Sequence, residues 1–280
     1  MPIPEGLHRP QTPGLFVVGA DTGVGKTVVT CLIADQLRRR TAHQAPRSRI
    51  GVLKPFATGC RKEREGLVSD DSEQLAVAAD FDPDIGDLDL ITPIRFRPPV
   101  APAVALEQSG QAELDWGALD RSLRRLDDRC DVVLIEGVGG LLVPLEQFAR
   151  NATCVTVLDV ARVIGFPVIV VTRAGLGTLN HTAMTCELIR RAGLSLAGIV
   201  VNAFEPDSPD ASQQTNRQWL ARQNNSRILA TLPGRATIDG VIPRPGGPTW
   251  SAHQIPNELR EAIDVTDFAA IARPGRAPQP

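Results

Sequence analysis

The sequence predicts an α/β fold with a single doubly wound, mainly parallel sheet flanked by helices. Short apolar runs alternate with segments of helical periodicity along almost the whole chain, which is typical of repeated β-α units. The apolar runs are nearly uninterrupted, as in strands that are buried on both faces. A glycine-rich stretch joins the first apolar run to the first helical segment. In such folds ligands bind at the carboxyl ends of the strands, so functional residues are sought there.

The alternation gives the elements in chain order. Strands are predicted at residues 15–18, 50–53, 132–135, 168–171, 198–201 and 228–230. Helices are predicted at residues 26–40, 71–79, 115–127, 155–164, 180–191, 211–222 and 258–271. Residues 94–103 are predicted to be a proline-rich crossing segment, and residues 231–256 a long loop. We expect a flexible N-terminal arm over residues 1–14, a single domain over residues 15–272 and a flexible tail over residues 273–280.

Composition limits the function classes. The chain has 280 residues, 42% of them hydrophobic and 22% charged, so it can bury an ordinary core. A net charge of −2 gives no reason to expect nucleic acid or an anionic membrane as a partner. No apolar run reaches the roughly 20 residues of a membrane span, and no secretory signal is recognisable. The five cysteines and four histidines lack metal-ligand spacing, so we expect a reduced, cytoplasmic protein without a transition metal.

The strongest motif is Gly19-Ala20-Asp21-Thr22-Gly23-Val24-Gly25-Lys26-Thr27. A glycine-rich turn between a strand and a helix directs several backbone N–H groups into one concavity, which attracts phosphate. Lys26 can then reach the β- and γ-phosphates of ATP, and the Thr27 hydroxyl can bind Mg²⁺. The usual first glycine would fall at Ala20 and lies one place earlier, at Gly19. The alternative is an ordinary βα turn that contains Gly-Lys-Thr.

Lys54 and Glu136 fall at predicted strand ends, and two aspartates open a predicted helix. Lys54 follows the second strand, where it would face the phosphate region, although a surface lysine is the simpler alternative. Asp70 and Asp71 open a predicted helix, either as N-cap residues or as a carboxylate that serves Mg²⁺. Glu136 ends the apolar run 132–135 and is followed by glycines, which is the Walker-B arrangement unless it is a chance acidic turn.

A second anion-binding turn is predicted after another interior strand. The run Arg173-Ala174-Gly175-Leu176-Gly177-Thr178-Leu179-Asn180-His181 places Gly and Thr ahead of a helix, where free N–H groups are available to an anion. A plain turn with Thr178 as the helix cap is the alternative.

Together these segments resemble the dethiobiotin synthase family. The resemblance lies in the glycine loop, Lys54-Pro55-Phe56-Ala57-Thr58-Gly59, Asp70-Asp71, residues 94–102, Glu136-Gly137-Val138-Gly139-Gly140 and residues 175–181, with order and spacing that agree over residues 15–202. The resemblance implies a P-loop fold and an ATP- and Mg²⁺-dependent reaction. In it, CO₂ is captured on one amine of 7,8-diaminopelargonate as a carbamate, which attacks the γ-phosphate of ATP. Ring closure by the second amine then gives dethiobiotin, ADP and phosphate.

The resemblance also implies residue roles. Lys54, Lys26 and Thr22 would be catalytic. Thr27, Asp71 and Glu136 would bind Mg²⁺. ATP would be bound by Gly23, Val24, Gly25, Lys26, Thr27, Val28, Asp71, Glu136, Gly137, Val138, Gly139, Asn202 and Pro233, with Asn202 at the position that reads adenine. The substrate would be bound by Thr22, Lys54, Thr58, Gly177, Thr178, Leu179 and Asn180. The last four of these residues would grip its carboxylate across the interface of a homodimer.

Three features depart from the family pattern. Gly23 stands where the family often has Glu. Asp70 competes with Asp71 for one role, and we favour Asp71 because Leu75 then falls in register. Beyond Asn202 the likeness fades.

Three rival functions share part of the pattern. A MinD/ParA-type switch ATPase would have a lysine early in the loop, where this chain has Asp21. The membrane-binding members of that class end in an amphipathic basic helix, a pattern that residues 273–280 of this chain lack. A ligase of the cobyrinic acid diamide synthase type would need a glutaminase domain with a Cys nucleophile, for which 280 residues leave no room. A domain that binds nucleotide without turnover is disfavoured because Lys54, Thr58 and Glu136 are all present.

Overall fold

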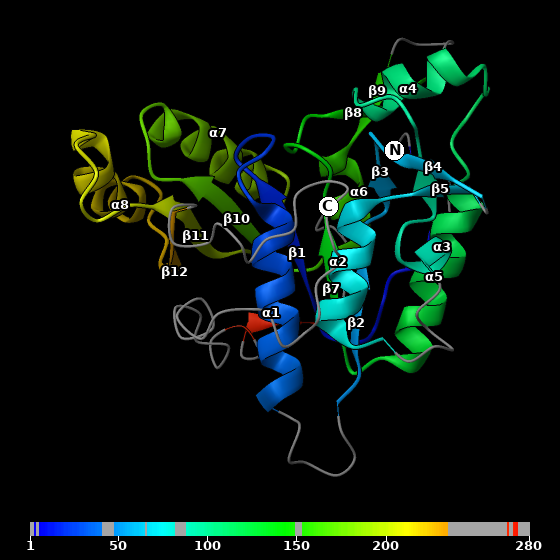
Figure 1. Ribbon diagram of the computed structural model, residues 1–280, viewed down its shortest axis with the longest axis horizontal. Helices are drawn as coiled ribbons and strands as arrows, with labels where there is room; N and C mark the ends of the chain where they lie inside the picture. Colours follow the sequence, from blue (N-terminus) through cyan, green and yellow to red (C-terminus); the bar gives the residue numbers. More distant parts are fainter. Residues whose placement is uncertain are drawn as a thin grey trace.

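The computed structural model describes residues 3, 6–40, 48–64, 66–81, 88–148, 153–234, 268 and 271–273. Its centre is a six-stranded sheet in the order β12-β11-β10-β1-β7-β2, in which every neighbouring pair is parallel (Figure 1). The strands are β1 (Gly14–Gly19), β2 (Ile50–Leu53), β7 (Val132–Glu136), β10 (Val168–Arg173), β11 (Leu196–Phe204) and β12 (Ile228–Pro233). The predicted fold class is therefore confirmed, and each predicted strand is present.

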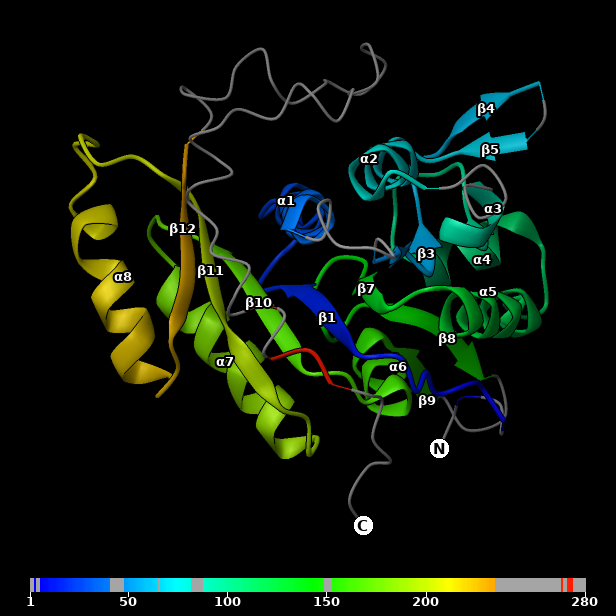
Figure 2. The ribbon, with the colours of Figure 1, turned by 90° about the horizontal axis from the view of Figure 1, so that it is seen from below.

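Helices cover both faces of the sheet, as Figure 2 shows. They include α1 (Lys26–Arg40), α2 (Asp70–Ala79), α5 (Trp116–Arg129), α6 (Val157–Ile164), α7 (Thr178–Arg191) and α8 (Ala211–Gln223). Alternation along β1 divides the core: Leu15 and Val17 pack with residues of α1 and α2, whereas Phe16 and Val18 pack with residues of α5 to α8. All four side chains are at most 1% exposed. Burial on both faces explains why the strand sequences are almost entirely apolar.

Several short elements were not predicted from the sequence. They are β3 (Phe56–Ala57) paired with β6 (Ile94–Arg95), the hairpins β4 (Arg61–Glu63) with β5 (Gly66–Val68) and β8 (Pro144–Phe148) with β9 (Thr153–Thr156), and helices α3 (Leu88–Ile91) and α4 (Pro102–Ser109). The helix predicted at 155–164 begins only at Val157, because Thr156 forms a capping box with Asp159 and ends β9. The crossing segment 94–103 begins as β6 and ends inside α4.

Part of the N-terminal segment expected to be a loose arm is bound to α5. The backbone N–H groups of Gln11 and Thr12 donate to Asp127 at 2.8 and 2.7 Å, and His8 contacts both Asp127 and Asp120. Gly14 and Arg273 exchange two backbone hydrogen bonds. Most of the predicted loop 231–256, most of the predicted helix 258–271 and the tail after Arg273 lie outside the described residues. The division into arm, domain and tail stays a prediction.

Within the described ranges, no helix is both long and apolar enough to span a membrane.

Candidate functional site

The glycine loop connects β1 to α1 at the carboxyl edge of the sheet. The shifted glycine has a steric reason. A Cβ atom at Gly19 would lie 2.5 Å from the carbonyl oxygen of Asp21 and 2.9 Å from Nζ of Lys26. Ala20 is only half-buried and tolerates its methyl group. The loop therefore requires glycine at position 19 and can omit it at position 20, which accounts for the departure from the common P-loop spacing.

Lys26 begins α1 and folds back over this loop. Its side chain is buried, and Nζ donates to the carbonyl oxygen of Asp21 at 3.4 Å. Burial lowers the pKa of Lys26, and the charge of Glu136 partly opposes that shift. An ammonium group has three N–H donors, so a phosphate that enters the loop supplies both a counter-charge and acceptors. This geometry fits the role predicted for Lys26.

Lys54, Asp71, Glu136 and Thr27 form one polar cluster, the Lys54 cluster, in which Asp71 and Thr27 are half-buried. Lys54 is 5% exposed and Glu136 is fully buried. Nζ of Lys54 donates to Oε1 of Glu136 at 2.8 Å and also pairs with Asp71. The Thr27 hydroxyl donates to the same Glu136 oxygen at 2.7 Å. The ends of β2 and β7 and the first turns of α1 and α2 thus meet at one point beside the phosphate loop. The positions of Lys54 and Glu136 at strand ends predicted that these two residues would meet there.

Charge compensation keeps Lys54 and Asp71 ionised. Burial alone would lower the pKa of Lys54, but the charges of Glu136 and Asp71 outweigh it and raise the pKa above the usual lysine value. Burial likewise tends to raise the pKa of Asp71, and the Lys54 charge and hydrogen bond reverse this and lower it. Both groups are therefore charged near neutral pH.

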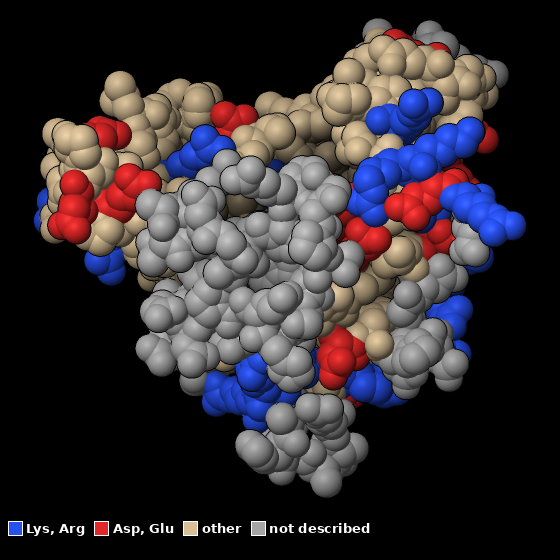
Figure 3. All heavy atoms as spheres, in the orientation of Figure 1, with Lys and Arg blue, Asp and Glu red and all other residues tan. Residues whose placement is uncertain are grey.

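The twin aspartates have separate partners. Asp71 faces Lys54, whereas Asp70 pairs with Arg61 of β4. Arg61 also contacts Glu73 at 3.2 Å, so it links the β4–β5 hairpin to the first turn of α2. In Figure 3, acidic and basic side chains lie side by side over β4, β5 and α2. The structure brings Asp71, and not Asp70, to the cluster that contains Lys54.

The cluster has the chemistry of a magnesium site. Oε2 of Glu136 is buried and has no hydrogen-bond partner within the described structure. Such an oxygen calls for an ion or a water molecule. Carboxylate and hydroxyl oxygens are ligands that Mg²⁺ accepts, and Mg²⁺ takes the rest of its shell from water and phosphate. The described residues contain no group of three His, Cys, Asp or Glu side chains placed to hold a metal by themselves.

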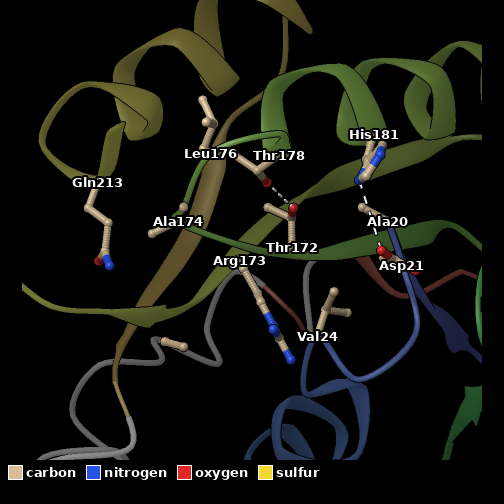
Figure 4. A pocket seen from close by; sticks show the side chains of 12 residues that line it. Ala20, Asp21, Val24, Thr172, Arg173, Ala174, Leu176, Thr178, His181 and Gln213 are labelled. Atoms are coloured by element: carbon tan, nitrogen blue, oxygen red, sulfur yellow. Dashed lines mark hydrogen bonds and ion pairs between the residues drawn. The ribbon is translucent and has the colours of Figure 1, made fainter. Parts of the chain in front are cut away.

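A second wall of the loop is formed by the ends of β10 and β11. Figure 4 shows a pocket of about 360 Å³ between the loop and the start of α7, lined among others by Asp21, Arg173, Thr178 and His181. The guanidinium group of Arg173 donates to the carbonyl oxygen of Gly23 at 2.6 Å. On the neighbouring strand, the amide of Asn202 donates to the carbonyl oxygen of Val24 at 2.9 Å.

The predicted carboxylate-binding segment occupies the first turn of α7. The hydroxyl group of Thr178 hydrogen-bonds to that of Thr172, and Thr178 also lines the pocket beside the loop. Gly177 and Asn180 are exposed and Leu179 is half-buried. No side chain caps this helix. The N–H of Thr178 donates to the carbonyl oxygen of Gly175, and the N–H groups of Leu179 and Asn180, which have no partner within the helix, can bind an anion. The segment therefore offers backbone donors of the kind predicted from its sequence, and its role in binding the substrate stays a prediction.

The remaining predicted residues lie around the loop. Thr22 is exposed and Thr58 is half-buried at the end of β3. Val28 is half-buried in α1. Gly137, Val138 and Gly139 follow β7, and a Cβ atom at Gly139 would lie 3.3 Å from the hydroxyl oxygen of Thr22. Pro233 ends β12 opposite Phe204 of β11. Their roles as ligands stay predictions.

Arg173 and Arg61 were missed as parts of the site. Arg173 is, like Lys54, a basic residue that follows an apolar run in the sequence, and this pattern could have identified it. Arg61 gave no such signal, because its role depends on a three-residue strand.

Comparisons with known proteins identify the family of the chain and its fold. The AAA domain family matches residues 13–241. The chain is 41% identical over 225 residues to the ATP-dependent dethiobiotin synthetase BioD of Anaeromyxobacter dehalogenans (strain 2CP-1), covering 80% of this chain and 92% of that one. It is 35% identical over 221 residues to the synthetase of the same name from Thermodesulfovibrio yellowstonii, covering 79% and 88%. A putative plasmid partition protein from Borrelia burgdorferi B31 bound to AMPPNP shares the fold, with a TM-score of 0.52, 11% identity and coverage of 94% and 98%.

The two kinds of similarity carry different weight. The structural likeness to the partition protein, at 11% identity, shows a shared fold only. The curated relatives match in sequence over most of both chains, and the region matched by the family model, residues 13–241, contains the glycine loop and the Lys54 cluster. The chain therefore belongs to the family of ATP-dependent dethiobiotin synthetases, which are P-loop ligases.

Proposed function

We propose that the Lys54 cluster and the glycine loop form the reaction centre of a dethiobiotin synthetase. The reaction is ATP-dependent carboxylation of 7,8-diaminopelargonate with CO₂ and ring closure to dethiobiotin, with release of ADP and phosphate. The observation that carries the proposal is the contact of Lys54 with both Glu136 and Asp71 beside a P-loop lysine. This arrangement supports a role for Lys54 as a cation beside the γ-phosphate, where charge is transferred.

The two lysines have different tasks. Lys26 holds the β- and γ-phosphates from within the loop, since its ammonium group is buried against the loop backbone. Lys54 faces the loop from β2 and stabilises the negative charge of the carbamate and of the transferring phosphoryl group. Thr22 and Thr58 orient the amine and carbamate end of the substrate. Most of the catalytic effect comes from positioning and electrostatic stabilisation.

Thr27, Asp71 and Glu136 would hold Mg²⁺ together with the phosphates of ATP. Bound there, Mg²⁺ would neutralise charge on the β- and γ-phosphates. The Glu136 oxygen that lacks a hydrogen-bond partner within the described structure supports this assignment.

The carboxylate of the substrate is bound by the first turn of α7 from a partner subunit. Within one chain, α7 follows β10 and Lys54 follows β2, and these two strands are separated by β1 and β7. The two strand ends are therefore three strand spacings apart, which amounts to roughly 14 Å. The exposed apolar side chains Leu176, Met184 and Trp219 on the α7–α8 side support a subunit interface. We therefore propose a homodimer in which each site uses residues of both chains.

The decisive experiment supplies purified protein with ATP, Mg²⁺, bicarbonate and 7,8-diaminopelargonate. Dethiobiotin and phosphate should form in equal amounts, and phosphate release should depend on the diamine. Steady ATP hydrolysis at a rate that does not depend on the diamine, with no ring product, would favour a nucleotide switch of the MinD/ParA type.

A further inference from the structure

Two adjacent strand ends hold consecutive carbonyl groups of the phosphate loop. Arg173 of β10 donates to the oxygen of Gly23, and Asn202 of β11 donates to the oxygen of Val24. Arg173 and Asn202 are direct partners in the β10–β11 register. The next carbonyl, that of Gly25, accepts from Val29 in the first turn of α1. Three successive carbonyl groups of the loop are thus fixed from outside it.

Fixing these carbonyl groups also fixes the N–H groups that follow them. A peptide bond is planar and trans, so the N–H of residue i+1 points opposite to the C=O of residue i. The hydrogen bond to Gly23 therefore sets the direction of the Val24 N–H, and the hydrogen bond to Val24 sets that of the Gly25 N–H. The positive φ angles of Gly23 and Gly25, +70° and +93°, curl the loop, and successive N–H groups in such a loop converge on an anion.

The close fit of Asn202 shows that this contact restricts the sequence of the loop. A Cβ atom at Gly25 would lie 2.0 Å from Nδ2 of Asn202, so only glycine admits the contact. Arg173 has an exposed side chain that is not part of the core. In Figure 4 its guanidinium group extends toward Val24 and the loop, away from Thr178 and His181. Its guanidinium group donates a hydrogen bond to the backbone of the loop, at Gly23.

We propose that Arg173 is a positioning residue that aims the N–H groups of Val24 and Gly25 at the phosphates of the bound nucleotide. This rests on the proposed function only in that the loop binds ATP. The competing role is direct contact between Arg173 and the nucleotide. The two roles differ because a positioning residue acts on the loop before any ligand is present and acts equally on every ligand that carries the phosphates.

The test compares R173M, which keeps the apolar stem, with R173K, which can still donate to Gly23, and with R217L, which removes an exposed cation from α8. Titration calorimetry measures Mg·ADP and magnesium tripolyphosphate. R173M should weaken both by the same factor, about tenfold for a charged hydrogen bond at a partly solvated site. R173K should recover part of the loss, R217L should behave as wild type, and the Tm should be unchanged.

Amide NMR of the ligand-free protein separates the two roles. In R173M the signals of Val24 and Gly25 should shift before ligand is added. Weaker ADP binding with unchanged tripolyphosphate binding would overturn the proposal in favour of a nucleoside contact. Unmoved amide signals with both affinities reduced would overturn it in favour of a phosphate contact, and unchanged affinities would show that the bond has no role. These binding measurements do not require that dethiobiotin forms.

Discussion

At the scale of single residues, Lys54 links the site's structure to its chemistry. A buried ammonium group is costly unless it is paired. Here two carboxylates, Asp71 and Glu136, compensate it. These carboxylates are also the proposed metal ligands. In the ligand-free protein Lys54 therefore supplies part of the positive charge that the metal ion would supply.

The first prediction separates the two lysines of the site. Lys54→Ala should remove most turnover, on the order of 10³-fold for a lost electrostatic contact in the transition state, while Mg·ATP affinity changes little. Lys26→Ala should weaken Mg·ATP binding strongly, because Lys26 contacts the phosphates in the ground state too. Titration with a non-hydrolysable ATP analogue, together with kcat, checks this. An equal loss of nucleotide affinity in both variants would contradict the assigned roles.

A second prediction follows from the buried carboxylate. Lys54→Met leaves Glu136 buried without its cation, which should reduce the free energy of unfolding by about 3 kcal/mol. Mg²⁺ without nucleotide should restore part of this loss, because a ligand of the folded state stabilises it. Thermal unfolding with and without Mg²⁺ measures the effect. The double variant K54M/E136Q is the control and should lose the Mg²⁺ response. If the Tm of K54M is the same with and without Mg²⁺, the result would count against metal binding at Glu136.

At the scale of elements, the β4–β5 hairpin sets the position of α2. Three acidic residues crowd the first turn of that helix: Asp70, Asp71 and Glu73. Arg61 pairs with Asp70 and Glu73, which leaves Asp71 to Lys54. Negative charge at a helix N-terminus is favourable, but three carboxylates in one turn also repel one another, so a cation on each side keeps them apart.

We therefore predict that Arg61→Gln lowers kcat/KM about fivefold, which corresponds to about 1 kcal/mol for a partly exposed ion-pair network. The loss should fall mainly on the Mg²⁺ requirement, because the variant disturbs Asp71 indirectly. The matched control is Lys62→Gln, which removes an exposed cation from the same strand. Activity measured over a range of Mg²⁺ concentrations checks this. Equal effects of both substitutions would show that only the net charge of the hairpin matters.

The attachment of the N-terminal segment to α5 gives an acid-sensitive element. Burial would raise the pKa of Asp127, but hydrogen bonds from the backbone of Thr12 and Gln11 outweigh it and lower the pKa. A folded-state pKa below the unfolded value, about 3.9, means that the stabilisation is complete above that value and is lost as the pH falls through the folded-state pKa.

Hydrogen exchange at Gln11 and Thr12 should therefore speed up, relative to core amides, as the pH falls below about 4. Asp127→Asn should show fast exchange already at neutral pH. Asp128→Asn, at an exposed position next to it, should resemble wild type. Exchange that is slow in D127N would show that the carboxylate does not hold the segment.

At the scale of the whole molecule, the sequence predicted the central sheet but not its accessories. The six sheet strands were found because burial on both faces imposes an apolar run. Strands of two or three residues such as β3 and β4 leave no such pattern. Helix α4 was missed because Pro98, Pro99 and Pro102 favour an extended chain, yet Pro102 occupies the first helical turn, where proline is tolerated.

The site shows the same division. The ends of parallel strands meet at one edge of the sheet, so Lys54 and Glu136 could be brought together from the sequence. The hydrogen bond between Thr178 and Thr172 could not be predicted, because Thr172, which also accepts from Thr182, becomes a neighbour of these two residues only when α7 packs on β10.

The proposed dimer can be tested by complementation. Asn180→Pro removes one backbone N–H in the first turn of α7, where proline is sterically acceptable. Mixed with Lys54→Ala chains, it should form heterodimers with one intact site, and activity should return to about a quarter of wild type in a symmetric two-site dimer. Sedimentation of each protein reports assembly. Full activity in a monomer, or no recovery on mixing, would refute a site shared between subunits.

The order of strands in the sheet also bears on how the chain is made. β1 lies between β7 and β10, and β2 pairs with β7 alone. Neither strand can therefore find a sheet partner until the ribosome has passed residue 136. Until then the apolar segments 15–18 and 50–53 have no neighbouring strand with which to pair. Nascent chains that stop before β7 should stay unfolded and bind chaperones, and the yield of this protein should depend on chaperone supply during the first half of its translation.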